Sequence, residues 1–477
     1  MIFGVGMMNR EKIKTLILAC LVVMSIIFTQ KVWFYYPMQI WPVETSVADK
    51  DLLKLEARNE LIVPERAIVN FGNNNYTIIT SNIRRTWEET KGTISLYFQG
   101  EPEITSVTYE KYREHSRLKS IELEFGEGIP SILIASIFNS LDNKIVNDIK
   151  EIKNILLPIT SRESIYIISK ENNVYEIKLS GLQEQNNLTA HINTLQATRH
   201  IKYHPLFMDV DNYTLMPLNY GEQIPFVFVE SEIDIADEAM VVEKAKTFFN
   251  ENLDFVKTIK ETSGALVFMY GYGEKGVRIS NRGRLEYTEE IGTEFSTDAV
   301  TALDVAIDFI KKHGGFPKNA YLKRTKHENK NGYYFAFDYR IEGLPVEFNN
   351  PNLVHPIEIE VYGNKVKYFR SFVRKNMGLP DVNSNNGVAL PHKAIENNIE
   401  LLISNYIIDL DVKEEISDKN ILNYIEKDIS KLELVYYDMI DETRRQLLIP
   451  AWKIKINKRV YYFNCYDSKL LYSKILN

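Results

Sequence analysis

The sequence predicts an α+β protein in which one N-terminal transmembrane helix precedes a three-domain external region, the later domains repeating a helix on an antiparallel sheet. Three observations predict this class. A single uncharged apolar run lies near the N-terminus, strand and helix patterns alternate beyond it, and a helix–hairpin unit recurs in the second half. In addition, 477 residues are more than one hydrophobic core normally organises.

The membrane helix is predicted from residues 15–29 (TLILACLVVMSIIFT), about 22 Å of helix at ~1.5 Å per residue. Basic residues precede it and aromatic residues follow it, which places the N-terminus in the cytoplasm and the rest outside a cell membrane. We therefore assign residues 1–36 to a cytoplasmic tip and a single-pass anchor. The membrane-interface residues are Arg10, Lys12, Lys14, Trp33 and Tyr35.

Three other interpretations of this segment are weaker. A cleaved signal peptide needs small residues after its apolar core, and residues 29–37 (TQKVWFYYP) offer none. A lipoprotein site at Cys20 would be followed by polar sequence, but the apolar run continues. A buried core helix would not need the basic flank and the aromatic exit. The uncleaved anchor is favoured.

The hydroxyl residues of the predicted anchor all lie on one side of it. At 100° per residue they fall within a sector of about 80°. Such residues allow close helix approach and interhelical hydrogen bonds; alternatively, they bond to their own backbone and face lipid. The residues of this partner-helix face are Thr15, Leu18, Val22, Ser25 and Thr29.

The external region is divided into a mixed domain at 43–205, a central α+β domain at 206–295 and a C-terminal α+β domain at 296–477, with a linker near 377–389. In the first domain we expect a helix within 49–61, hairpins at 66–80 and 165–179, strands at 93–99 and 120–125, and a helix from Pro130. The three repeats are predicted from helices near 241–250, 297–312 and 390–406 and from final strands at 284–287, 365–368 and 469–472.

No motif supports catalysis, a cofactor or a metal. The glycines of 271–276 match GxGxxG, but strand and turn patterns follow instead of a helix, so we expect turn glycines. His200 and His204 are the only close histidines, and no carboxylate stands at a zincin position. A net charge of −7 argues against nucleic-acid binding, and two cysteines exclude a disulfide framework.

Several segments together resemble the YycH family. They are 8–18 (MNREKIKTLIL), 33–37 (WFYYP), 64–72 (PERAIVNFG), 121–125 (IELEF) with Ile129 and Pro130, and 449–452 (IPAW).

This resemblance implies a non-enzymatic regulator of the cell-wall sensor histidine kinase WalK (YycG), acting with a related YycI protein through membrane helices. It also implies an external three-domain protein whose later domains share one topology. The alternatives are a PepSY-like extracytoplasmic module that binds a peptidase or a cell-wall component, and an anchored cell-wall hydrolase.

Overall fold

The computed structural model describes residues 18, 21–22, 24, 47–161, 163–182, 186–206, 214–220, 223–250, 253–292, 295–328, 331–380, 387–410, 418–441 and 444–476. The chain forms two compact units, 1–54 and 55–477. Of the first, Leu18, Leu21, Val22 and Met24 are helical and exposed, and α2 (Val47–Leu61) leads into the second. A search of the described helices finds none with the length and hydrophobicity of a membrane span.

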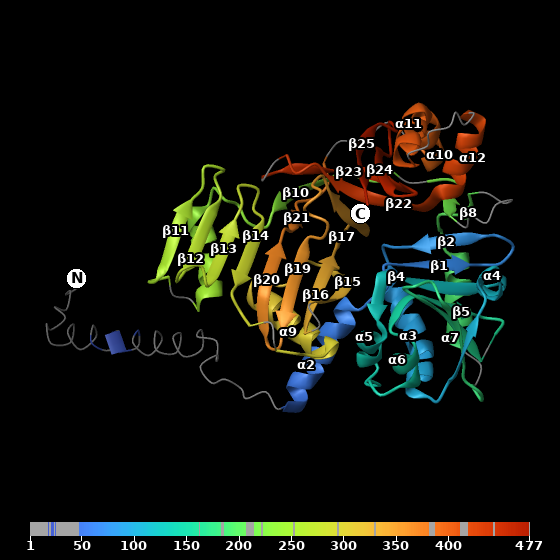
Figure 1. Cartoon of the computed structure of the whole chain (residues 1–477), viewed down its shortest axis with the longest axis horizontal. Coiled ribbons are helices and arrows are strands. Elements are labelled where there is room, and N and C mark those ends of the chain that lie inside the picture. Colours follow the sequence, from blue (N-terminus) through green and yellow to red (C-terminus); the bar gives the residue numbers. More distant parts are fainter. Residues whose placement is uncertain are drawn as a thin grey trace, which may run out of the picture. The chain divides into compact units, whose positions relative to one another are not determined.

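The first sheet of the larger unit has nine antiparallel strands in the order β3-β7-β6-β5-β4-β1-β2-β8-β9 (Figure 1). Their bounds are β1 Arg66–Asn70, β2 Tyr76–Ile79, β3 Glu103–Val107, β4 Ser120–Pro130, β5 Glu151–Pro158, β6 Ser164–Ser169, β7 Val174–Lys178, β8 Tyr203–Pro205 and β9 Leu215–Pro217. The expected hairpins are present as β1–β2 and β6–β7.

Helices cover both faces of this sheet because its central strands are apolar on both sides. In β5, Ile155 and Leu157 join the main core, whereas Leu156 joins a separate cluster with Tyr112 of α4 (Tyr109–Ser116). Alternation along the strand places these two clusters on opposite faces. The other helices are α3 Ile83–Gln99, α5 Ser131–Ser136, α6 Lys144–Asp148 and α7 Asn186–Ala197.

One expected strand is wrong. Residues 93–99 form the end of α3 and not a strand. Ile94, Tyr97 and Phe98 recur at spacings of three and four residues and are buried on one side of the helix, as is Trp87 further back. The helix expected from Pro130 is present as α5, with Pro130 at its N-cap.

The second sheet contains two antiparallel meanders joined edge to edge, in the order β11-β12-β13-β14-β20-β19-β16-β15. The bounds are β11 Val256–Lys260, β12 Leu266–Tyr270, β13 Lys275–Ile279, β14 Leu285–Glu289, β15 Tyr321–Glu328, β16 Gly332–Asp338, β19 Ile357–Tyr362 and β20 Lys365–Ser371. Two helices precede the meanders: α8 Glu238–Lys246, followed by η1 Thr247–Phe249, and α9 Ala299–Lys312.

The third sheet contains the last meander together with strands from earlier in the chain. The meander is β22 Ile429–Asp438, β23 Gln446–Ile456, β24 Arg459–Asn464 and β25 Leu470–Ile475, preceded by helices α10 Pro391–Asn397, α11 Ile399–Leu410 and α12 Asp418–Asp428. Three segments join it: β10 Val227–Ser231, the hairpin β17 Arg340–Ile341 with β18 Leu344–Phe348, and β21 Arg374–Asn376. β18 pairs with β22 in parallel.

The helices and final strands expected in the second half are present, and their descent from one repeated topology stays a prediction. Each of the three helical segments precedes a four-stranded meander, and β14, β20 and β25 are the predicted final strands. Residues on both sides of the predicted boundary at 295 share one sheet, and one buried core extends through all three sheets. The domain division therefore stays a prediction, with 55–477 forming a single compact unit.

Candidate functional site

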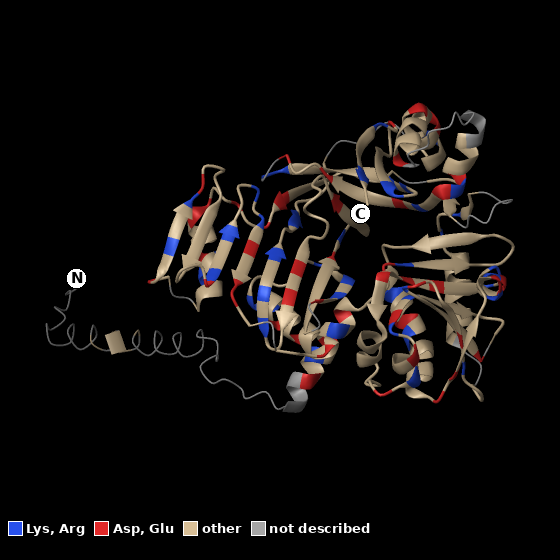
Figure 2. Cartoon of the chain, in the orientation of Figure 1, with Lys and Arg blue, Asp and Glu red and all other residues tan. Residues whose placement is uncertain are grey.

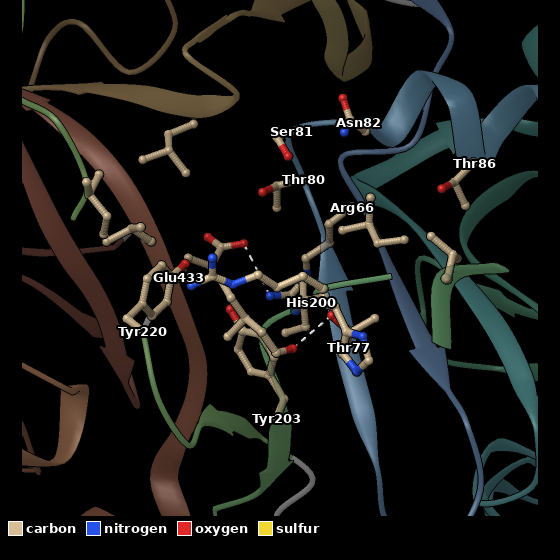
Figure 3. Close-up of a pocket in the computed structure, with 18 of the residues that line it drawn as sticks. Arg66, Thr77, Thr80, Ser81, Asn82, Thr86, His200, Tyr203, Tyr220 and Glu433 are labelled. Carbon is tan, nitrogen blue, oxygen red and sulfur yellow. Dashed lines mark hydrogen bonds and ion pairs between the residues drawn. The ribbon is translucent and has the colours of Figure 1, made fainter. Parts of the chain in front are cut away.

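A cavity of about 890 Å³ lies between the first and third sheets, within the range of ligand pockets. One wall is β2 with the start of α3, and a second is the segment 198–203 with the end of α7. The opposite wall is β22 with the loop before β18. Figure 3 shows side chains from these walls, with Thr80 and Ser81 facing the same space as Glu433 and Tyr220.

His200 presents an unused hydrogen-bond acceptor in the wall of this pocket. Its Nδ1 lies 2.8 Å from the carbonyl oxygen of Thr198, so Nδ1 is the protonated nitrogen. Its Nε2 is buried and has no hydrogen-bond partner among the described residues. The ring packs on Phe71 with 4.9 Å between centroids, which fixes its direction. A bound molecule that donates a hydrogen bond would satisfy Nε2.

A buried ionic cluster, which we call the junction, forms the floor of the pocket and joins all three sheets. Glu65, just before β1, accepts from Lys323 Nζ of β15 at 2.6 Å and from Lys431 Nζ of β22 at 3.3 Å. Burial raises the pKa of Glu65, but the two lysines outweigh that effect and hold it well below its usual value. Glu65 is therefore charged in the folded protein.

Arg66 extends the junction toward the pocket. Its Nε lies 2.5 Å from Glu124 of β4, and its Nη1 lies 3.5 Å from Glu433 of β22. Burial would lower the pKa of Arg66, and the two carboxylates reverse this and raise it. Figure 3 shows the Arg66–Glu433 pair in the wall of the pocket. The charged floor is thus internally paired, which leaves recognition to the other lining groups.

Polar residues at the mouth of the pocket give it a positive rim. Arg85, Arg199 and Lys202 line the pocket and are exposed, against one exposed lining carboxylate, Glu342. Charged residues are interspersed over the rest of the fold, as Figure 2 shows. The local excess of positive charge favours an acidic ligand.

The structure describes two of the predicted site residues. Leu18 and Val22 of the partner-helix face are helical, with 63% and 52% of their surface exposed. The other residues of that face, Thr15, Ser25 and Thr29, lie outside the described residues, as do the membrane-interface residues Arg10, Lys12, Lys14, Trp33 and Tyr35. The predicted partner face and anchor remain predictions.

The motifs set aside in the sequence have structural roles. Gly271 and Gly273 adopt φ of 60° and 102° in the turn between β12 and β13, as expected for antiparallel strands. His200 and His204 lie on no common helix, since His204 is in β8. No group of three potential metal ligands occurs in the part of the chain that the structure describes. The pocket was missed because its lining comes from distant segments, each without a motif.

Comparisons with known proteins agree with the fold. Residues 11–197 match the family model described as YycH protein, N-terminal domain. YycH from Bacillus subtilis aligns with a TM-score of 0.52 at 12% identity, covering 85% of this chain and 96% of that one. No curated protein matches the chain significantly.

Two further solved structures align less well. An uncharacterized protein from Eubacterium rectale ATCC 33656 gives a TM-score of 0.33 at 12% identity, over 52% of this chain and 86% of that chain. The C-terminal domain of Bacillus megaterium YpeB gives 0.26 at 10% identity, over 50% and 98%. Both TM-scores are too low to indicate a common fold. The N-terminal part of the chain, residues 11–197, is thus similar to the YycH family, and over most of its length the chain has the fold of B. subtilis YycH.

Proposed function

We propose that this chain is a non-enzymatic, membrane-anchored regulator of a two-component system, modulating the cell-wall sensor histidine kinase WalK alongside a YycI-like protein. The observation that carries the proposal is the family match, which begins at residue 11, in the basic flank of the predicted anchor, and continues through most of the first sheet. A protein of this class would have its N-terminus in the cytoplasm and its sheets outside the cell.

The anchor is the proposed site of contact with the kinase. Leu18 and Val22 are exposed apolar residues on a helix, as are Leu21 and Met24, and a cluster of such residues favours contact with lipid or another helix. With Thr15, Ser25 and Thr29 they form the predicted partner-helix face. A helix that packs better against one state of a kinase shifts the kinase toward that state by the difference in binding free energy.

Substitution of the polar face tests this proposal. Two interhelical hydrogen bonds at roughly 0.6 kcal/mol each give about 1.2 kcal/mol, or about an eightfold shift between kinase states. We therefore expect Ser25→Leu with Thr29→Leu to change transcription of a kinase-dependent reporter severalfold. The matched control is Met24→Leu with Ile27→Leu, on the opposite side of the helix, which should leave the reporter unchanged.

The external domains are the second candidate for carrying the regulation, and the pocket supports this alternative. A chimera in which an unrelated membrane helix replaces residues 15–29 separates the two. Unchanged reporter output in the chimera would refute the helix contact and assign the function to the external sheets, as in an extracytoplasmic binding module.

A further inference from the structure

We propose that the pocket binds an extended, acidic peptide segment of a partner protein, which adds as a strand to the open edge of β2 beside the basic residues of the mouth. This inference is independent of the proposed function, since it holds whether or not the anchor contacts a kinase.

The open edge follows from the pairing of β2. On one side β2 pairs with β1 along its whole length, but on the other it pairs with β8 only at Tyr76 and Tyr203. The amide of Phe71 donates to the carbonyl of Asn75 at 2.9 Å, which makes that pair hydrogen-bonded. Hydrogen-bonded pairs alternate in an antiparallel ladder, so the backbone of Ile78 points away from β1.

The segment 198–203, which leads into β8, departs from β2 where the pocket begins. Continuing the Tyr76–Tyr203 register would place Ile78 opposite Ile201. Instead, the side-chain hydroxyl of Thr77 donates to the carbonyl of Ile201 at 2.9 Å, and no strand is paired with Ile78 on that side among the described residues. Residues 77–81 and 198–203 both line the pocket, opposite β22 (Figure 3). This wall of the pocket therefore contains an unpaired strand edge at Ile78.

An extended peptide matches the groups that line this part of the pocket. Its amides and carbonyls can pair with the backbone of Ile78, and its terminal amide or a polar side chain can donate to the buried Nε2 of His200. Its acidic side chains would meet Arg85, Arg199 and Lys202 at the mouth. Strand addition requires donors and acceptors at alternating positions along the ligand, which a peptide backbone supplies.

Binding of short synthetic peptides to the full-length chain in detergent micelles tests the inference by calorimetry. The probe is the capped tetrapeptide acetyl-Glu-Val-Glu-Val-amide, and the charge control replaces both acidic residues with lysine. Two N-methylated forms of the acidic peptide carry methyl groups on the glutamate amides or on the valine amides, so that each blocks one edge of the strand. We expect the acidic peptide to bind and the lysine peptide to bind at least tenfold more weakly.

Strand pairing makes a specific prediction for the methylated pair: one form should lose binding and the other should retain it, because only one edge of the peptide faces β2. Arg85→Glu with Lys202→Glu should weaken the acidic peptide about tenfold, which is 1.4 kcal/mol. The matched control is Lys257→Glu, an exposed position on β11 outside the pocket.

Three results would overturn the inference. They are failure of the acidic peptide to bind at about 1 mM, equal binding of both methylated forms, and unchanged binding after the double charge reversal in a protein whose circular dichroism is unaltered. Binding of an N-acetylglucosamine oligomer to the same pocket in place of the peptides would equally refute a peptide site.

Discussion

Substitution of Glu65 should weaken the whole larger unit, because this carboxylate, beside the first sheet, pairs with lysines of the other two sheets. Glu65→Gln keeps the shape of the side chain and removes its charge, leaving Lys323 buried without its partner at 2.6 Å. Breaking one side of a buried pair costs about 3–5 kcal/mol, and Lys431, which is more exposed and has Glu433 at 2.8 Å, adds little to this. We expect a loss of about 3 kcal/mol.

Urea unfolding of the full-length chain, followed by tryptophan fluorescence, measures this loss. Trp87 in α3 and Trp452 in β23 are both buried and report on the first and third sheets. Adding Lys323→Met to Glu65→Gln should restore at least about 1 kcal/mol, because it removes the unpaired charge. A Glu65→Gln protein as stable as the wild type would refute the proposed role of the junction.

The effect of Glu65→Gln should also depend on pH. The folded pKa of Glu65 is lowered, so its contribution is fully present above the unfolded value of about 4.3 and is lost as the pH falls through the folded value. The difference in stability between wild type and variant should therefore be largest near neutrality and shrink below about pH 4. Glu261→Gln, which breaks a partly exposed surface pair with Arg278, is the control and should change much less than Glu65→Gln at any pH.

Three further predictions concern other parts of the fold. Asp438→Asn should destabilise the third sheet by about 3 kcal/mol in urea unfolding, because Asp438 and Arg374 form a pair with fully buried side chains; a loss below about 1 kcal/mol would contradict this. Burial raises the pKa of the Cys465 thiol to about 12, so peptide mapping should find it unmodified after iodoacetamide treatment of the native protein at pH 8 and alkylated only after unfolding. Gly283→Ala should lower the melting temperature measured by calorimetry, since Gly283 has φ of 79° and an added Cβ would collide with Ser231; an unchanged melting temperature would show that the turn can adjust.

Local patterns in the sequence predicted most helices and strands, but they did not predict which strands pair with one another. The turn at Gly283 and the strand after it follow from turn chemistry and alternation, and both are present. The strand predicted at 93–99 was wrong. Its β-branched and aromatic residues favour a strand, but burial of Ile94, Tyr97 and Phe98 on one face of α3 stabilises a helix instead. Tertiary packing overrode local propensity there.

Sheet membership could not be predicted because it depends on segments far apart in the chain. Strand β10 precedes the second sheet in sequence but pairs with β21 and β23 in the third. The hairpin of β17 and β18 leaves the second meander to pair with β22. Nothing in the local pattern of these strands distinguishes them from strands that pair with their neighbours. The pocket could not be predicted for the same reason, because its walls belong to the first and third sheets.

The segment from Pro64 to Gly72 illustrates what a sequence motif can and cannot reveal. It is one of the segments that carry the family resemblance, and alternation predicted its strand. Its two charged residues, Glu65 and Arg66, gave no sign of their role, because their partners lie elsewhere: Lys431 is 366 positions from Glu65 in the chain. Only the fold brings these charges together. Because they are buried, removal of one charge leaves its partners unpaired and lowers the stability of the folded protein. The same residues pair the first sheet with the third, and Glu65, Arg66 and Glu433 line the pocket between them. A change at Glu65 should therefore alter peptide binding as well as stability, which links the two predictions through one structural cause.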